Sequence, residues 1–227
     1  MIQAADLPPA PGGGAAAREP AQMDSLDTAQ LIAVASVLGF ASGIRLYLVL
    51  FAVGLAGHLQ WVDLPAGLQL LAHPWVLAAS GAMMAIEFLA DKVPAIDSLW
   101  DTVHTLIRIP AGAALAAAVF GGDAALWATI AAILGGSLAA TSHFTKAGGR
   151  ALINTSPEPF SNAAASSAED GLVLALLLLV LAYPWVAAAV VLLLVLAALW
   201  LLPKLFRFIG RLLRRLLGTP PAREAPR

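Results

Sequence analysis

Several ionisable and polar residues lie between long apolar runs, and their side chains could bind a charged solute or relay protons. The chain has 227 residues, of which 60% are hydrophobic and only 12% charged. This composition is typical of an integral membrane protein. Ionisable groups at membrane depth usually face a protein interior or water, because lipid solvates them poorly. The candidate pathway residues are Arg45, Glu87, Asp91, Asp97, Asp101, His104, Arg108, His143, Lys146, Arg150, Asn162, Ser166, Glu169 and Asp170.

One predicted helix carries four of these residues at intervals of four, three and four, which places them on a single face. They are Asp97, Asp101, His104 and Arg108. At about 1.5 Å per residue, Arg108 lies roughly 16 Å beyond Asp97, close to the middle of a hydrocarbon core about 30 Å thick. Arg45 reaches a similar depth on its own segment. We therefore expect these arginines to meet acidic residues of other helices inside the bundle.

Two interpretations of these charges stay open. In the first, the protein is a small-solute channel or transporter with a polar chamber that opens to the cytoplasm. Its cations attract an anionic group of the solute, and its acids and histidines carry coupling protons. In the second, structural ion pairs hold the helices of a non-transporting scaffold or lipid-handling protein in register. Asp97 and Asn162 could also be simple helix N-caps, and each histidine a satisfied interior hydrogen-bonding group.

Other classes of function have no support in the sequence. The chain has no cysteine, which excludes disulfides, thiolate metal ligands and cysteine nucleophiles. It contains no metal-binding spacing, phosphate loop or nucleophile elbow. Its basic residues form no extended polar patch of the kind that binds nucleic acid. We predict no catalytic residue, metal, cofactor or nucleic-acid partner, and a protein that is not an enzyme.

The hydrophobic pattern predicts an all-α, polytopic helical bundle with about six transmembrane helices. The first predicted helix exceeds the membrane thickness, so it must tilt, break near Gly39–Gly43 or extend beyond the membrane. Pro94–Asp97 and Pro159–Asn162 each open a helix on the same side, which suggests that two helical hairpins form an internal repeat. The spans are expected at about residues 26–57, 74–90, 97–120, 124–148, 162–182 and 185–202.

Four regions follow from this pattern: a disordered tail at 1–24, a transmembrane domain at 25–202, a basic amphipathic juxtamembrane helix at 203–217 and a disordered tail at 218–227. The basic residues within 204–215 should bind anionic lipids of the inner leaflet. Lys and Arg concentrate on one side of a six-span arrangement, which predicts that both termini are cytoplasmic. We also expect a homo-oligomer in the lipid bilayer.

Four stretches carry a resemblance to a known family. They are Gly39–Leu46, Ala90–Asp97, Lys146–Asn162 and Ala168–Asp170. On these motifs the chain resembles, over about residues 28–200, the bacterial membrane-protein family catalogued as domain of unknown function 4126. The resemblance implies an all-helical, multi-pass protein of the bacterial inner membrane. It implies no activity and assigns no functional residue.

Overall fold

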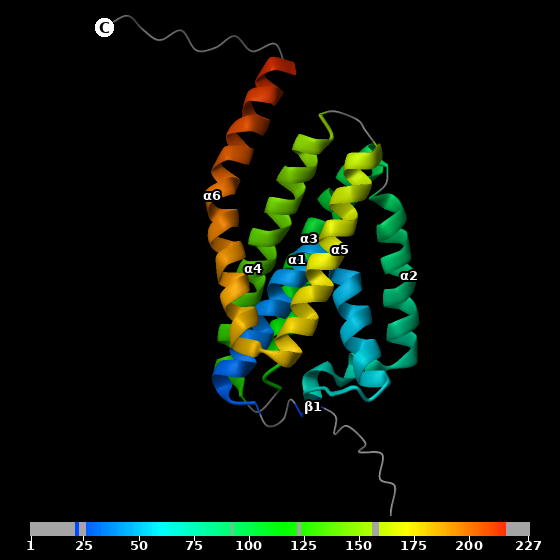
Figure 1. Cartoon of the computed structure of the whole chain (residues 1–227), viewed down its shortest axis with the longest axis vertical. Helices are drawn as coiled ribbons and strands as arrows, with labels where there is room; N and C mark the ends of the chain where they lie inside the picture. The colour runs from blue at the N-terminus through cyan, green and yellow to red at the C-terminus, as the bar shows by residue number, and fades with distance from the viewer. Residues whose placement is uncertain (1–20, 23–25, 92, 122–123, 156–158, 217–227) are drawn as a thin grey trace, which may run out of the picture.

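The protein is an all-α bundle, as predicted (Figure 1). The computed structural model describes residues 21–22, 26–91, 93–121, 124–155 and 159–216. Two short strands, β1 (Ala21–Gln22) and β2 (Val62–Asp63), and a 3-10 helix, η2 (Ala66–Ala72), accompany six α-helices. These helices are α1 (Thr28–His58), α2 (Pro74–Ala90), α3 (Pro94–Ala118), α4 (Ala125–Ile153), α5 (Pro159–Ala182) and α6 (Pro184–Leu216).

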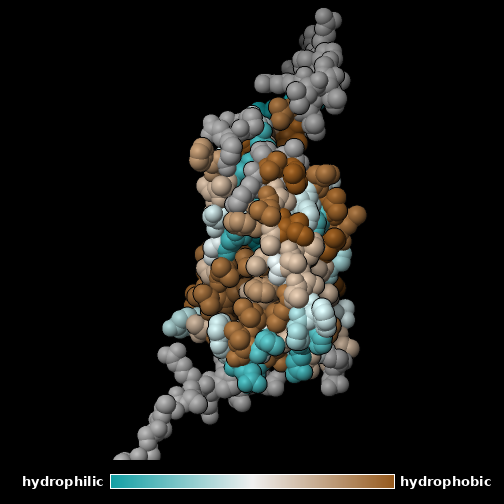
Figure 2. Space-filling view, turned by 90° about the vertical axis from the view of Figure 1, so that its right-hand side faces the viewer, coloured by the Kyte–Doolittle hydropathy of each residue, from teal (hydrophilic) through white to brown (hydrophobic). Residues whose placement is uncertain are grey.

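The helices identify the chain as a membrane protein. Within the described residues, α1, α4, α5 and α6 are long and apolar enough to cross a membrane, and η2 with α2, bent by 69°, would count as a fifth such segment. α3 is more polar because it carries several of the ionisable residues. Figure 2 shows the face of the bundle that carries α2, where hydrophobic residues cover most of the surface and hydrophilic residues gather at the lower end.

α1 is a helical hairpin and not a single straight span. A straight helix of 31 residues would separate its ends by about 46 Å. Instead, β1 precedes α1, β2 follows it, and the two strands pair in parallel. The helical backbone breaks at Arg45, where φ is −141° and ψ is 75°. The first half of α1 therefore enters the bundle, and the second half returns to the same end (Figure 1).

The hairpin changes the predicted topology. Each of the other five α-helices runs from one end of the bundle to the other (Figure 1). β1 lies at the lower end, where α2, α4 and α6 begin, and Leu216 lies at the upper end, where α3 and α5 begin. The described helical domain therefore begins and ends at opposite ends of the bundle, because the first predicted span crosses only part of it and turns back. That both termini are cytoplasmic stays a prediction, since residues 1–20 and 217–227 lie outside the described residues.

α4 donates hydrogen bonds to backbone carbonyl groups of α1 beside its break. The Ser142 hydroxyl donates to the Phe40 carbonyl at 2.7 Å, and the Lys146 ammonium donates to the Ile44 carbonyl at 3.2 Å. Irregular backbone at membrane depth is tolerated only where protein groups or water replace the lost hydrogen bonds. The tip of the hairpin is thus built jointly by α1 and α4.

Small residues allow α1, α3 and α4 to pack closely. A Cβ added to Gly39 would collide with the backbone of Gly135, and one added to Gly135 would collide with Ala116 of α3. Gly43 lies equally close to Ala139. The length of the first apolar run predicted a tilt, an extension or a break near Gly39–Gly43. The structure uses its glycines for helix contact and breaks two residues later.

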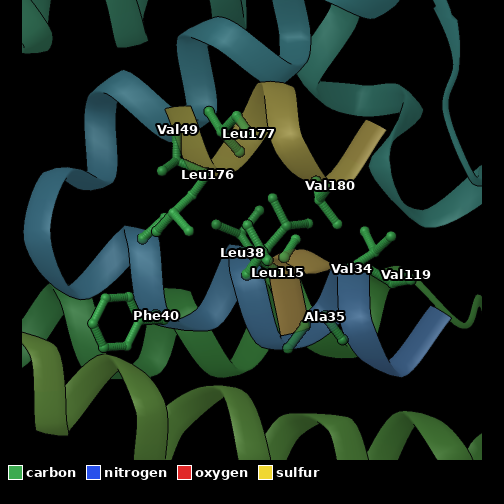
Figure 3. Packing of buried hydrophobic residues seen from close by; sticks show 14 of the residues in the cluster. Val34, Ala35, Leu38, Phe40, Val49, Leu115, Val119, Leu176, Leu177 and Val180 are labelled. Carbon is green, nitrogen blue, oxygen red and sulfur yellow. The ribbon is translucent and has the colours of Figure 1, made fainter. Parts of the chain in front are cut away.

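The apolar core surrounds both halves of the α1 hairpin (Figure 3). Val34 and Leu38 come from the first half, and Val49 comes from the second half. They pack with Leu115 of α3 and Val180 of α5. Because the core encloses α1, the charged tip at Arg45 is held inside protein and away from lipid.

The helix ends differ in detail from the predictions. α1 is capped by Asp27, whose carboxylate accepts from the Gln30 backbone amide at 2.8 Å. α6 continues through Pro203 to Leu216, so the predicted basic segment at 203–217 extends the preceding helix as far as it is described. Of the predicted tails at 1–24 and 218–227, only Ala21–Gln22 lie within the described residues.

Candidate functional site

Arg45 lies at the tip of the α1 hairpin and contacts acidic residues of two other helices. Its guanidinium pairs with Asp91, at the end of α2, and its Nε lies 2.8 Å from the Asp170 carboxylate of α5. Glu169 is a more distant partner at 3.4 Å. Nη2 also donates to the Ser166 hydroxyl at 2.6 Å. The Arg45 side chain is 2% exposed, so these contacts replace water almost completely.

Arg108 forms a second centre, deeper in α3. It pairs with Glu87 of α2 and with Asp101, one Nη lying 2.6 Å from the Asp101 carboxylate. The same nitrogen lies 3.3 Å from Nδ1 of His143 on α4. Arg108 is fully buried and Glu87 is 1% exposed. The predicted convergence of Arg45, Glu87 and Arg108 in the interior is therefore present, although Arg45 and Arg108 use different acids.

Lys146 and Arg150 of α4 join the two centres. The Lys146 ammonium lies 3.4 Å from Asp101 and 3.6 Å from Glu169. Arg150 binds both carboxylate oxygens of Glu169 at 3.0 Å and lies 3.8 Å from Asp91. Glu169 is thus shared between cations of α1 and α4. The result is one continuous network, which we call the charge cluster, to which α1, α2, α3, α4 and α5 all contribute.

In the part of the chain that the structure describes, the charge cluster contains one more carboxylate than cationic group. Among the described residues, five carboxylates face four cationic groups, and three of the buried carboxylates leave one oxygen without a hydrogen-bond partner. Those atoms are Glu87 Oε2, Asp91 Oδ1 and Asp101 Oδ2. A buried carboxylate oxygen without a partner is costly. Nε of Arg45 and Nε of Arg108 also have no hydrogen-bond acceptor, so acids and bases of the cluster both retain unused hydrogen-bonding groups.

The hydrogen bonds of His104 and His143 require opposite tautomers of the two rings. Nδ1 of His104 lies 2.8 Å from the Trp100 carbonyl and must donate to it, so Nε2 accepts from the Tyr47 hydroxyl at 3.1 Å. In His143, Nε2 lies 2.7 Å from the Thr105 hydroxyl, whose proton already goes to the Asp101 carbonyl. Nε2 therefore donates to Thr105, and Nδ1 accepts from Arg108. Each neutral ring is satisfied on both sides.

The capping interpretation of Asn162 is wrong. α5 begins at Pro159, so Asn162 lies inside the first turn, where its side chain donates to Asn154 at 2.8 Å and accepts from Arg150 at 3.2 Å. α3 begins at Pro94 with Val93 as its N-cap, so Asp97 is not an N-cap either. The side chain of Asp97 lies outside the part of the chain that the structure describes.

The other predicted site residues all have a place in the network or directly beside it. Sequence reasoning missed Tyr47, Thr105 and Asn154, which supply hydrogen bonds to His104, His143 and Asn162. One signal could have found Thr105: it lies four residues after Asp101 and therefore on the same helical face. Within the described residues, no group of His, Asp or Glu side chains is placed to hold a metal ion.

Comparison with known proteins identifies a family for this chain. No curated protein and no solved structure matches it. A family described as a domain of unknown function, DUF4126, matches residues 32–204. The match covers the α1 hairpin and every helix that contributes to the charge cluster. The chain therefore belongs to the DUF4126 family.

Proposed function

We propose that the protein is a membrane transporter for a small solute and that the charge cluster is its solute-binding or proton-binding centre. The observation that carries this proposal is the break of α1 at Arg45, inside the cluster. Discontinuous helices that place charged groups at the middle of a bundle are typical of secondary transporters, where half-helices bind the solute and coupling ions. Movement of the hairpin tip would expose the cluster to one side or the other.

The charge balance favours a cation or a proton over an anion. The sequence alone pointed to an anionic group attracted by Arg45 and Arg108. In the structure, however, carboxylates engage both arginines, and among the residues that the structure describes the cluster has five carboxylates and four cationic groups. A bound anion would add to the negative surplus, whereas a cation or proton would neutralise it. Glu169 and Asp170 are the acids through which it would arrive, because they are the more exposed ones, at 17% and 28%.

The proposed orientation places the upper end of the bundle in the cytoplasm of a bacterium, with the protein in the inner membrane. Lys146, Arg150 and the basic face of α6 all lie toward that end, in accordance with the preference of basic residues for the cytoplasmic side. Lys204, Arg207, Arg211 and Arg214 line one hollow on α6. Their spacing and charge support binding to anionic lipid headgroups of the inner leaflet.

Charge movement in reconstituted vesicles tests the transport proposal. Proteoliposomes on a solid-supported membrane are exposed to a panel of small inorganic and organic cations and anions at two pH values. We expect transient currents from at least one cation or from protons, and we expect Arg45→Ala to abolish them. Arg207→Ala, which removes an exposed arginine of α6, is the matched control and should keep the current.

Folding is checked by size-exclusion elution and by tryptophan emission. If Arg45→Ala does not remain folded, Asp170→Asn replaces it, because Asp170 is partly exposed and makes one ion pair. Absence of current from the folded wild type across the panel contradicts the proposal. So does a current that survives both cluster variants.

A second candidate function is a membrane scaffold whose ion pairs are structural. It is favoured by the nearly complete burial of Arg45, Glu87 and Arg108, whose side chains are 2%, 1% and 0% exposed. In that case the folded wild type carries no current, and removal of any buried cation leads to unfolding. The experiment above separates the two functions, because it records current and folding on the same variants.

A further inference from the structure

An apolar groove lies between α1, α2, α5 and the β2–η2 segment. Its volume is about 590 Å³, which falls within the range of about 300–1,000 Å³ that is typical of small-molecule sites. Every residue that lines it is apolar, including Phe51 of α1, Met84 of α2 and Leu174 of α5. The groove is therefore large enough for an organic molecule, and its walls are almost entirely hydrocarbon.

The rim of the groove is exposed on the outside of the bundle. Trp61 and Leu178 both line it, and they are 66% and 68% exposed. Because this surface faces lipid in a membrane protein, an apolar molecule dissolved in the bilayer can reach the groove without crossing water. In Figure 2 a small hydrophilic area interrupts the hydrophobic surface at about half the height of the bundle.

The walls of the groove lead to the charge cluster on all three helices. On α5, Leu174, Leu178 and Leu181 form a stripe at helical spacing that continues back to Asp170. On α1, Leu48 follows Arg45 by three residues. On α2, Met84 precedes Glu87 by the same interval. On α5, one end of the groove therefore lies about one helical turn from Asp170, the most exposed acid of the cluster.

We propose that this groove binds an amphiphilic organic cation, with its apolar body between α1, α2 and α5 and its positive charge beside Asp170. The inference rests on the proposed transport function and names the class of solute. Asp170 suits a cationic head because it is 28% exposed and makes a single ion pair, with Arg45. The unpartnered oxygens of Glu87 and Asp91 would stabilise the same charge electrostatically.

The charge of the cluster decides against the other bilayer molecules that could enter an apolar groove. An anionic phospholipid would bring a phosphate toward a site with surplus carboxylates, which is unfavourable. An uncharged hydrocarbon would be stabilised by the apolar walls of the groove but would form no electrostatic interaction with Asp170. A lipophilic cation satisfies both the apolar walls and the acidic end.

Binding of tetraphenylphosphonium to the purified full-length protein in nanodiscs tests this proposal. Tetraphenylborate, an anion of nearly the same size and shape, controls for partition into lipid, and protein-free nanodiscs provide the background. We expect saturable binding of the phosphonium and none of the borate. We expect Asp170→Asn to weaken binding by about tenfold, which corresponds to about 1.4 kcal/mol.

Two tryptophan variants distinguish loss of binding caused by a narrower groove from loss caused by any larger side chain on the protein surface. Leu178→Trp narrows the groove, whereas Leu193→Trp adds the same bulk to an exposed position of α6 that does not line it. We expect Leu178→Trp to abolish binding and Leu193→Trp to leave it unchanged. Equal binding of the borate, or phosphonium binding that survives both Asp170→Asn and Leu178→Trp, overturns the proposal.

The outcomes distinguish this inference from the transport function on which it rests. Specific phosphonium binding without any current means that the site is correct and transport is wrong. Currents with small hydrophilic cations, together with no saturable phosphonium binding, mean that transport is correct and the solute class is wrong.

Discussion

Removal of the Arg108 guanidinium should destabilise the protein through Glu87 more than through Asp101. Arg108 is fully buried, and Glu87, 1% exposed, has no other cationic partner among the described residues. Asp101 keeps the Lys146 ammonium at 3.4 Å. Arg108→Met therefore leaves Glu87 as an uncompensated buried charge, a change that typically costs about 3–5 kcal/mol.

A second substitution should identify which acid causes the loss. Glu87→Gln in the Arg108→Met background removes the stranded charge, and about half of the lost stability should return. What remains is the cost of a buried amide without a full set of partners, about 1–3 kcal/mol. Asp101→Asn in the same background should restore much less, because the charge that it removes is still paired with Lys146.

Unfolding in mixed micelles of a non-ionic detergent and SDS, followed by tryptophan fluorescence, gives the free energies for the four proteins of each double-mutant cycle. The cycle separates the coupling between two side chains from their individual effects. If Arg108→Met lowers the free energy of unfolding by less than about 1 kcal/mol, the Arg108 ion pairs contribute no more than exposed ion pairs do. That result would contradict their burial. Equal rescue by Asp101→Asn would show that the two acids are equivalent partners.

Two further predictions concern the α1 hairpin. Because the chain has no native cysteine, single cysteines at Asp27 and Gln60 should react with a membrane-impermeant maleimide from the same side, and one at Arg214 from the opposite side. Labelling of Asp27→Cys and Gln60→Cys from different sides would mean that α1 crosses the membrane once. Gly43→Ala should lower stability by about 1–3 kcal/mol through overpacking against α4. Gly171→Ala, which meets nothing within 4 Å, should be neutral or stabilising by up to about 1 kcal/mol, and equal losses in SDS unfolding would contradict this packing.

The helices and the buried charges were largely predictable from the sequence, because both depend on local pattern and on the cost of charge in lipid. Long apolar runs ended by proline or glycine located α2, α4 and α5 to within a few residues. Arg45, Glu87 and Arg108 stood out because each interrupts an apolar segment. Their convergence in the interior followed from the need of each charge for a partner.

The hairpin of α1 was not predictable in this way. Its apolar run is long enough for one crossing of the membrane, and hydropathy does not show whether such a run continues straight or turns back. What reverses the chain at Arg45 is tertiary: carbonyl partners from Ser142 and Lys146, and carboxylates from Asp91 and Asp170. The sequence also could not predict which acid pairs with which base in the charge cluster. Helical spacing shows which residues share a face of one helix, but it does not show which neighbouring helix that face contacts.

The position of this hairpin at the start of the helical domain has a consequence for biogenesis. α1 leaves the ribosome before α2 to α6, yet its bend requires side chains from helices that are synthesised later. Until those helices arrive, Arg45 lacks the carboxylates of Asp91 and Asp170, and the Ile44 carbonyl lacks the Lys146 ammonium. A helix that is translated before its partners is thus among the last to reach its native shape, and the insertion machinery must hold or reorient it while α2 to α5 are made.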